Sequence, residues 1–335
     1  MLVAQYAAGG QGRFESSYDA GQHQGPAAKA RQVEGTSALP DRQDDGSGVI
    51  ARLQRRRRPL WIRALRHPSS LVGAVLLSVI AFGAVFAPSI APYPPLTQDL
   101  SAALSPPSRT HLFGSDDFGR DVFSRVIFAG RISITAGLIA SLIAAVGGVL
   151  TGLVAGYYGG WADELISRGI DILLAFPGFL LALAVLAMLG PSLANAMVAV
   201  AISSIPGFTR VVRGSVLAEK SRDYIMAARA LGCGSARVMV RHLLPNIAAP
   251  IFVLATLRAG QTILITASLS FLGMGAQPPT PEWGLMLSLG RAYIRVAWWL
   301  TFFPGLAIAM TVLALNLLGD GLRDTLDPRL RKMGG

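Results

Sequence analysis

The sequence predicts an all-α membrane protein, a polytopic bundle of about six transmembrane helices. Of its 335 residues, 52% are hydrophobic and only 15% are charged, which is more apolar than a soluble domain normally is. The apolar residues also gather in runs that reach the roughly 20 residues a helix needs to cross the hydrocarbon core. Lipid is therefore the expected solvent.

The chain before the first apolar run is polar and then basic. Residues 1–50 are rich in Gly, Gln, Ala, Ser and Asp and lack periodicity, so we expect a disordered cytoplasmic tail. Residues 51–69 hold a run of arginines that starts at Arg55, followed by Trp61 among leucines, which indicates a basic segment lying at the membrane interface. The transmembrane domain is expected over residues 70–335.

The apolar spans follow from length and from breaks in the pattern. No charged residue lies between Asp171 and Arg210, a stretch that is too long for one crossing and that is interrupted by Gly190 and Pro191. It is therefore expected to form two helices. The expected spans are residues 71–91, 132–156, 172–190, 192–209, 247–272 and 300–319, with a cytoplasmic loop at 210–246.

The distribution of basic residues predicts the orientation. With the amino terminus inside, the inner segments hold 19 Lys and Arg and the outer segments hold 6. Because positive residues resist translocation, both termini are expected in the cytoplasm. Topology thus explains the net charge of +11, which leaves little reason to expect nucleic acid as a partner.

Residues that could bind metal or nucleotide are sparse. The one cysteine, Cys233, and four scattered histidines form no cluster with zinc-ligand spacing, so no metal is expected. The three lysines are Lys29, Lys220 and Lys332, and none follows a glycine as a Walker loop requires. No nucleophile with a base and no positioned carboxylate pair is evident, so we do not expect an enzyme.

The inner loop at 210–246 is expected to be structured. Between Arg222 and Asn246, apolar residues alternate with arginines at helical spacing, and Gly232 to Gly234 separates two short helices. The apolar face of such a helix needs a partner. The lipid surface and another protein are equally good candidates on physical grounds.

This loop resembles the EAA loop of permeases of ATP-binding-cassette (ABC) importers. The shared pattern is Ala227 and Ala228, three residues, Gly232, nine residues, and then a segment that ends in Leu-Leu-Pro. Met226 replaces the usual glutamate and His242 replaces the usual aliphatic residue. If the loop binds an ATPase, the contact then rests on shape and apolar burial.

Three further segments resemble the dipeptide, oligopeptide and nickel permease group. They are FGSDDFGRDVFSRVIFAGRISI, ASLSFLGMGAQPPTPEWG and GDGLRDTLDPRLR, and the similarity covers about residues 59–331 in order. The resemblance implies the type I ABC importer permease fold, in a bacterial cytoplasmic membrane, forming half of a pathway for di- or oligopeptides. Peptides, glutathione and nickel remain open as substrates.

The same resemblance implies the partners and their contacts. These are a second, different permease subunit, two ABC ATPase domains that hold ATP and Mg, and an extracytoplasmic peptide-binding protein. Closure of the ATPases on ATP would move the short helix of the inner loop and switch the pathway between inward and outward access. The residues implied in ATPase coupling are Asp223, Tyr224, Ala227, Ala228, Leu231, Gly232, Leu244 and Pro245.

A row of glycines marks the second span. Gly148, Gly152, Gly156 and Gly160 recur at four-residue intervals, which places them along one helix face and allows another helix to come close. Packing within the subunit and contact with a partner permease both remain open.

The fifth span contains one charge that composition does not explain. Arg258, Thr262 and Thr266 lie at four-residue spacing with Gln261 beside them, and together they form a polar stripe. Because charge is costly in lipid, one hypothesis is that the stripe lines the translocation path, where Arg258 could attract a peptide carboxylate. The alternative is a helix that begins nearer Phe252, with the arginine snorkelling to the inner headgroups.

The segment between the first two spans is expected on the outer side and is rich in charged residues. Asp116, Asp117, Arg120, Asp121 and Arg125 do not follow the order of a calcium loop. By resemblance the segment lies where a binding protein docks; a capped helix with local ion pairs is the alternative. The expected spans hold no Asp or Glu, which disfavours an ion-coupled secondary transporter.

Overall fold

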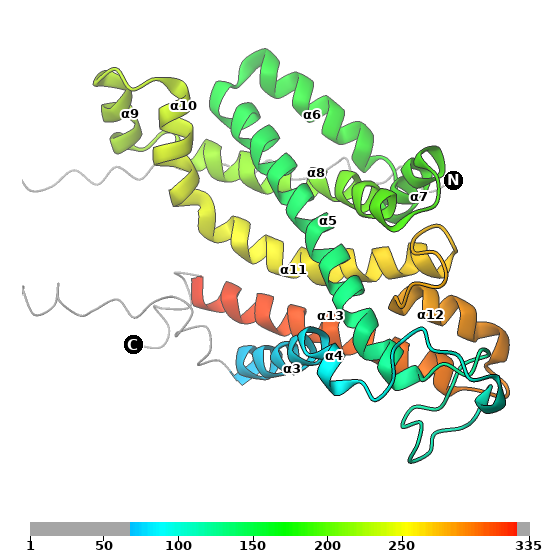
Figure 1. Ribbon diagram of the computed structural model, residues 1–335. Helices are drawn as coiled ribbons and strands as arrows, with labels where there is room; N and C mark the ends of the chain where they lie inside the picture. The colour runs from blue at the N-terminus through cyan, green and yellow to red at the C-terminus, as the bar shows by residue number, and fades with distance from the viewer. Residues whose placement is uncertain (1–67, 327–335) are drawn as a thin grey trace, which may run out of the picture. The chain divides into compact units, whose positions relative to one another are not determined.

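The structure is a computed structural model that describes residues 68–326. The expected tail, nearly all of the interfacial segment and the end of the GDGLRDTLDPRLR motif lie outside the described residues. Within them the chain is all-helical, as predicted (Figure 1). The elements are α3 (Pro68–Val85), α4 (Ala87–Ile90), η1 (Leu100–Ala102), α5 (Val122–Tyr158), α6 (Gly160–Leu174), α7 (Gly178–Leu189), α8 (Leu193–Glu219), α9 (Asp223–Ala230), α10 (Ser235–Arg237), the π-helical η2 (Val238–Leu243), α11 (Leu244–Phe271), α12 (Trp283–Gly290), η3 (Arg291–Tyr293) and α13 (Trp299–Leu326).

Five helices are long and apolar enough to cross a membrane, and a bent pair makes a sixth candidate. The five are α3, α5, α8, α13 and the continuous helix Ser235–Phe271 that includes α11. The sixth is α6 with α7, which meet at 93°. The expectation of one helix over 172–190 is therefore wrong, because the chain turns before Pro177, which has no N–H to continue the ladder.

Helix α5 is longer than the span expected at 132–156. It has 37 residues, about 55 Å at 1.5 Å per residue, which exceeds the roughly 30 Å of hydrocarbon. Its start lies ten residues earlier because Asp121 caps it, accepting a hydrogen bond from Ser124 N. In Figure 1, α5 runs obliquely across α8 and α11, so that it packs against both.

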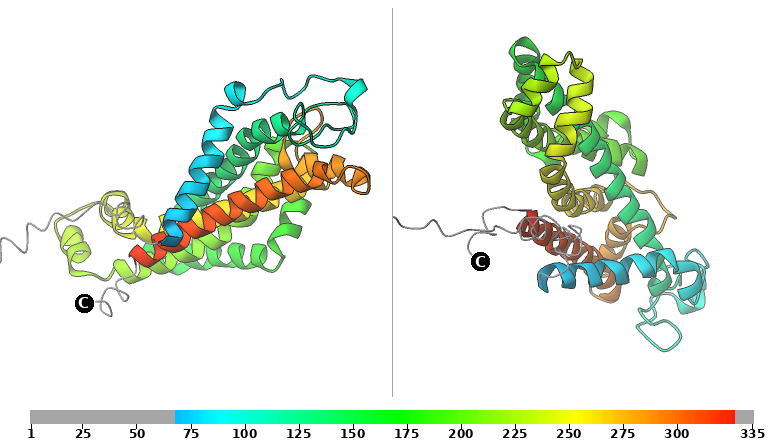
Figure 2. Two further views of the ribbon diagram at one scale, coloured as in Figure 1. Left: turned by 90° about the horizontal axis from the view of Figure 1, so that it is seen from below. Right: turned by 90° about the vertical axis from the view of Figure 1, so that its left-hand side faces the viewer.

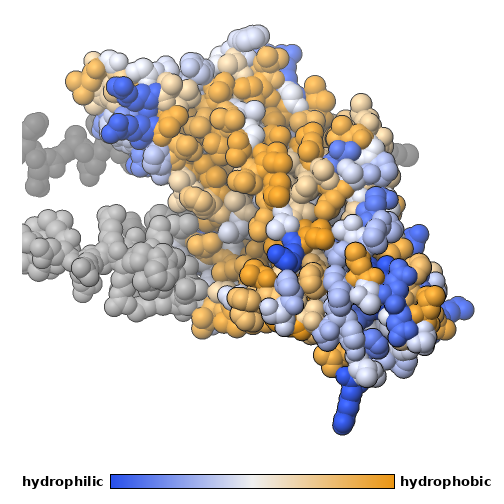
Figure 3. All heavy atoms as spheres, viewed as in Figure 1, coloured by the Kyte–Doolittle hydropathy of each residue, from blue (hydrophilic) through white to orange (hydrophobic). Residues whose placement is uncertain are grey.

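The remaining helices pack beside this crossing. Helix α11 lies between α8 and α13, and α3 packs along α13, as the two views in Figure 2 also show. Buried side chains from α5, α7, α8 and α11 form one apolar cluster: Ala140, Ala182, Leu186, Ala196, Ala199, Val200 and Leu269. Figure 3 shows a broad apolar surface over the middle of the bundle, with hydrophilic residues gathered on α9 and at the opposite end.

Three of the four glycines in the predicted row bring α5 against α8. A Cβ atom on Gly148 would lie 2.2 Å from Phe208 Cβ, and Cβ atoms on Gly152 and Gly156 would lie 2.7 and 2.8 Å from the Cβ atoms of valines on α8. Real Cβ atoms do not approach so closely. The neighbour of these glycines is therefore a helix of the same subunit.

Gly160 does not belong to this row, and that part of the prediction is wrong. Helix α5 ends at Tyr158, and Gly159 and Gly160 adopt φ angles of +67° and +51°. They form the turn into α6, and nothing lies within 4 Å of the place where a Cβ on Gly160 would be. Glycine suits this turn because it has no Cβ to clash at positive φ.

Candidate functional site

The inner loop folds into a compact unit, which we call the handle and define as Asp223–Leu243. It lies beyond the ends of α8 and α11, at the left of Figure 1. Helix α9 ends at Ala230, and Gly232, with a φ angle of +82°, reverses the chain. The second short helix expected here is α10 with the π-helical η2, which runs directly into α11.

An apolar cluster anchors the handle to the bundle. Ile225, Val238 and Leu243 are fully buried. They pack on residues of α5, α8 and α11, namely Leu153, Val212, Val216 and Ile247. The handle is thus attached to three helices at once, and these apolar side chains pack on the permease itself.

The opposite side of the handle is exposed and partly apolar. Tyr224, Met226 and Leu231 have 38%, 53% and 86% of their surface exposed, respectively. Asp223, Ala227, Gly232 and Pro245 are exposed as well. We call this surface, made by Tyr224, Met226, Ala227, Leu231 and Gly232, the α9 face.

Two residues of the predicted coupling set lie elsewhere. Ala228 is only 7% exposed and points into the protein, so it does not contribute to the exposed side of the handle, and its part in coupling stays a prediction. Its helical position one residue after Ala227 turns it about 100° away from the free side. Leu244 is half-buried against the anchoring cluster.

Polar contacts fix the start of α9. Tyr224 Oη donates to Glu219 Oε1 at 2.7 Å, and Arg222 Nε lies 3.0 Å from Glu219 Oε2. Partial burial, together with the Glu219 carboxylate, raises the pKa of Tyr224 to about 12. The phenol therefore stays protonated at neutral pH and keeps donating. The Arg229 guanidinium lies 4.7 Å from the centre of the Tyr157 ring on α5.

Ion pairs join α6 to α8. Arg213 binds both carboxylate oxygens of Asp163, at 2.5 and 2.7 Å, and Arg210 Nη2 lies 2.8 Å from Asp171 Oδ1. Both arginines of α8 thus have a carboxylate partner.

The members of the predicted polar stripe on α11 differ in burial. Thr262 and Thr266 are buried, with 0% and 2% of their surface exposed. The Thr262 hydroxyl donates to Gly137 O on α5 at 2.9 Å, and the Thr266 hydroxyl donates to Thr262 O at 2.8 Å. The expectation that these two threonines line an open path is therefore wrong for this structure.

Arg258 is half-buried and Gln261 is exposed. Arg258 Nη1 donates to Gln261 Oε1 at 2.8 Å. Helix α11 begins at Leu244 and continues a helix that starts at Ser235, so the helix itself does not start near Phe252; snorkelling of Arg258 to the inner headgroups stays a prediction.

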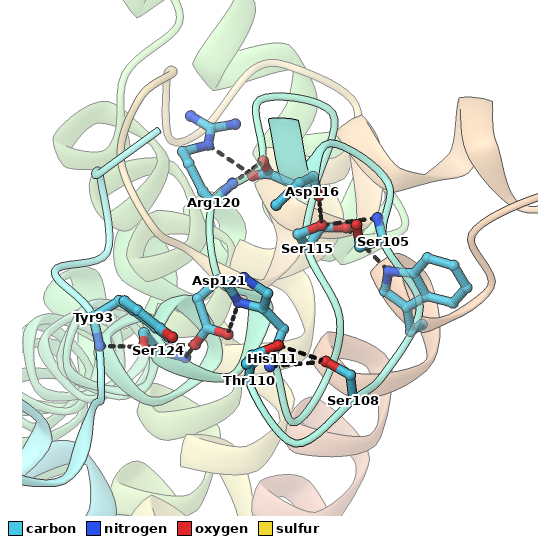
Figure 4. Close-up of polar contacts among 12 residues, drawn as sticks. Tyr93, Ser105, Ser108, Thr110, His111, Ser115, Asp116, Arg120, Asp121 and Ser124 are labelled. Carbon is cyan, nitrogen blue, oxygen red and sulfur yellow. Dashed lines mark hydrogen bonds and ion pairs between the residues drawn. The ribbon is translucent and has the colours of Figure 1, made fainter. Parts of the chain in front are cut away.

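The segment between α4 and α5, which is expected on the outer side, is held by buried polar groups (Figure 4). Asp116 accepts hydrogen bonds from Arg120 N at 2.9 Å and Arg120 Nε at 2.7 Å. Asp121 caps α5, accepting from Ser124 N at 2.8 Å and Ser124 Oγ at 2.7 Å, and lies 3.0 Å from His111 Nδ1. This arrangement is the capped helix with local ion pairs that the sequence analysis kept as an alternative.

Replacing Asp121 by alanine is expected to destabilise the protein by about 1–2 kcal/mol, because a helix cap is lost and Ser124 loses a buried acceptor. The temperature at which half of the purified permease leaves the monodisperse state should fall accordingly. The matched control is Asp99→Ala, which removes a cap from the exposed turn η1 and should change that temperature much less. Equal shifts for the two variants would contradict this assignment.

A buried carboxylate that sequence reasoning did not single out joins α12 to α5. Glu282 is 1% exposed; its Oε1 accepts from Ser133 Oγ at 3.1 Å and its Oε2 accepts from Leu285 N at 2.8 Å. Trp283 donates through Nε1 to Val126 O at 2.9 Å. The only signal in the sequence was an acidic residue directly before an apolar helical run, which is typical of a helix cap.

Comparison with known proteins decides the family. Residues 148–332 match the family described as binding-protein-dependent transport system inner membrane component. Residues 58–107 match the N-terminal transmembrane domain of oligopeptide transport permease C. The chain belongs to this permease family. It is therefore a multi-pass inner-membrane subunit of an ABC importer, without catalysis or cofactor of its own, and the ATPase is a separate component.

Relatives of the permease are named either for dipeptides and tripeptides or for glutathione. The dipeptide permease DppC of Alkalihalophilus pseudofirmus is 47% identical over 266 residues, covering 79% of this chain and 88% of the relative. The di/tripeptide permease DppC of Pseudomonas aeruginosa is 46% identical over 277 residues, covering 81% and 91%. The glutathione permease GsiD of Pectobacterium atrosepticum is 48% identical over 276 residues, covering 82% and 91%. The predicted peptide permease group is thereby confirmed.

Among solved structures, an inward-facing MetNI methionine ABC transporter aligns with the permease at a TM-score of 0.49 and 18% identity. The alignment covers 61% of this chain and 97% of that one.

Proposed function

We propose that this permease forms one half of a transmembrane path for short peptides and that a second, different permease subunit forms the other half. The observation that carries the proposal is extended similarity, over 79% and 81% of the chain, to permeases named for dipeptides and di/tripeptides. Glutathione, named for another relative, is itself a tripeptide. The common chemistry is a small solute with an amide backbone and free carboxylates.

The second permease subunit is proposed to cover an apolar groove between α11, α12 and α13. The groove has a volume of about 540 Å³ and is lined by Leu264, Ala267, Phe271, Leu287, Gly305, Ile308, Ala309 and Val312, among others. Small residues let helices approach closely in lipid, where van der Waals packing drives association. Ala267, Gly305 and Ala309 provide that access here.

The α9 face is proposed as the surface that the ATPase holds. Its apolar residues are solvent-exposed, although they belong to a unit that is rigidly anchored through Ile225, Val238 and Leu243. Such a surface is typical of a docking site for another protein. Because Met226 occupies the place of the family's glutamate, apolar burial supplies the contact.

Uptake by the complete importer tests the peptide assignment. Proteoliposomes that contain this permease with its partner permease, ATPases and binding protein should accumulate a labelled dipeptide when ATP is supplied. A non-hydrolysable ATP analogue is the control and should support no accumulation. Accumulation of nickel without any uptake of dipeptide, tripeptide or glutathione would contradict the proposal.

A further inference from the structure

The middle of α11 carries an arginine without an acidic partner among residues 68–326. Arg258 lies about 21 Å from the start of α11 at Leu244 and about 20 Å from its end at Phe271, at 1.5 Å per residue. Its side chain reaches neither end of the helix. None of the ion pairs of the described residues includes it.

The guanidinium group of Arg258 lies between α8 and the side chain of Gln261. A Cβ atom on Gly207 of α8 would lie 2.8 Å from Nη2 and 3.2 Å from Cζ of Arg258, so the guanidinium lies directly against the α8 backbone at this glycine. Nη1 donates to Gln261 Oε1 at 2.8 Å. A neutral amide orients the guanidinium without compensating its charge.

The nearby arginines of α8 differ from Arg258 in this respect. Arg210 and Arg213 each bind a carboxylate of α6. A guanidinium has five N–H donors, and Arg258 uses one of them on a side chain. In the described part of the chain, Ser70 Oγ is the only fully buried side-chain polar atom without a partner, so the remaining donors of Arg258 are not sealed inside the protein.

We infer that Arg258, which lies against Gly207 and is oriented by Gln261, binds a carboxylate of the solute as the solute passes through the membrane. A guanidinium pairs with a carboxylate through two parallel charge-assisted hydrogen bonds, and Arg258 has no acidic partner among the described residues to occupy them. The identity of the solute as a peptide rests on the proposed function. The site itself requires only a solute with a free carboxylate.

Uptake of a labelled dipeptide by the reconstituted importer is the first test. Arg258→Gln is expected to lower the initial rate at least about tenfold, and Arg258→Lys should restore part of it, since lysine keeps the charge but not the fork. The control is Arg168→Gln, which removes an exposed ion pair on α6 and should leave the rate unchanged. A wild-type rate in Arg258→Gln would overturn the inference.

A charge-selective thiol reaction gives a readout that does not depend on the solute or on transport. In a Cys233→Ser background, Gln261→Cys should react roughly tenfold faster with an anionic than with a cationic methanethiosulfonate reagent, because Arg258 is adjacent. Adding Arg258→Gln should abolish this preference. Thr262→Cys is the matched control and should not react, since Thr262 is fully buried.

The two measurements separate failure of the site from failure of the proposed function. Anion preference at position 261 without any peptide uptake by the unmodified importer would refute the peptide assignment and support the site. The inferred carboxylate site at Arg258 would be overturned in either of two cases. In the first, the importer takes up peptide but the thiol of Gln261→Cys reacts no faster with the anionic reagent. In the second, neither reagent reaches that thiol.

Discussion

Replacing Gly148 by alanine is expected to destabilise this permease by at least about 3 kcal/mol, at the upper end of what overpacking costs. The added Cβ would lie 2.2 Å from Phe208 Cβ and 3.0 Å from Thr209 N. Neither atom is at the flexible end of a side chain, so α5 and α8 would have to separate. The yield of monodisperse protein and its melting temperature measure the effect.

A matched glycine serves as the control for this substitution. Gly214 lies on α8, and nothing is within 4 Å of the place where its Cβ would be. Gly214→Ala should leave stability unchanged or raise it slightly, because alanine favours helix. If Gly148→Ala were as stable as Gly214→Ala, close contact between α5 and α8 would be refuted.

Replacing Leu231 by glutamate is expected to reduce ATP-driven uptake more than about tenfold while the permease itself stays folded. Leu231 is 86% exposed, so its replacement disturbs no internal packing. If the ATPase buries this position, an unpaired carboxylate there costs several kcal/mol in docking. A tagged permease should therefore recover less ATPase on purification.

Leu100→Glu is the control for Leu231→Glu. Leu100 is 70% exposed and lies in the outer segment, so the same chemical change occurs away from the handle. Recovery of the ATPase should not change. Equal recovery of ATPase with Leu231→Glu and with the unmodified permease would refute docking through the α9 face.

Composition and apolar length were sufficient to predict an all-helical membrane protein, and ordered motifs were sufficient to predict its family. The faces of individual helices were harder to predict. Ala227 and Ala228 are the same type of residue, yet Ala227 is exposed and Ala228 is buried. This difference could not be predicted, because alanine occurs on packed and on free helix faces alike. Thr262 and Thr266 appear polar in sequence, but their hydroxyls bind helix carbonyls, so both are compatible with burial.

The ends of helices and the hydrogen bonds between distant residues were also hard to predict from the sequence. The glycine spacing continues through Gly160, although the helix has already ended at Tyr158. Glu282 and its partner Ser133 are 149 residues apart, so nothing local indicates their hydrogen bond. Pro177 was a visible signal for the bend between α6 and α7, but an uninterrupted apolar run concealed it.

The glycine contacts between α5 and α8 also bear on how force passes through the permease. At Gly148, Gly152 and Gly156 the backbone of α5 lies directly against the Cβ atoms of Phe208 and two valines of α8, with no α5 side chain in between. The same two helices carry part of the apolar cluster beneath the handle. We therefore expect α5 and α8 to move together whenever the handle moves, because α5 has no side chain at these three positions that could yield between them.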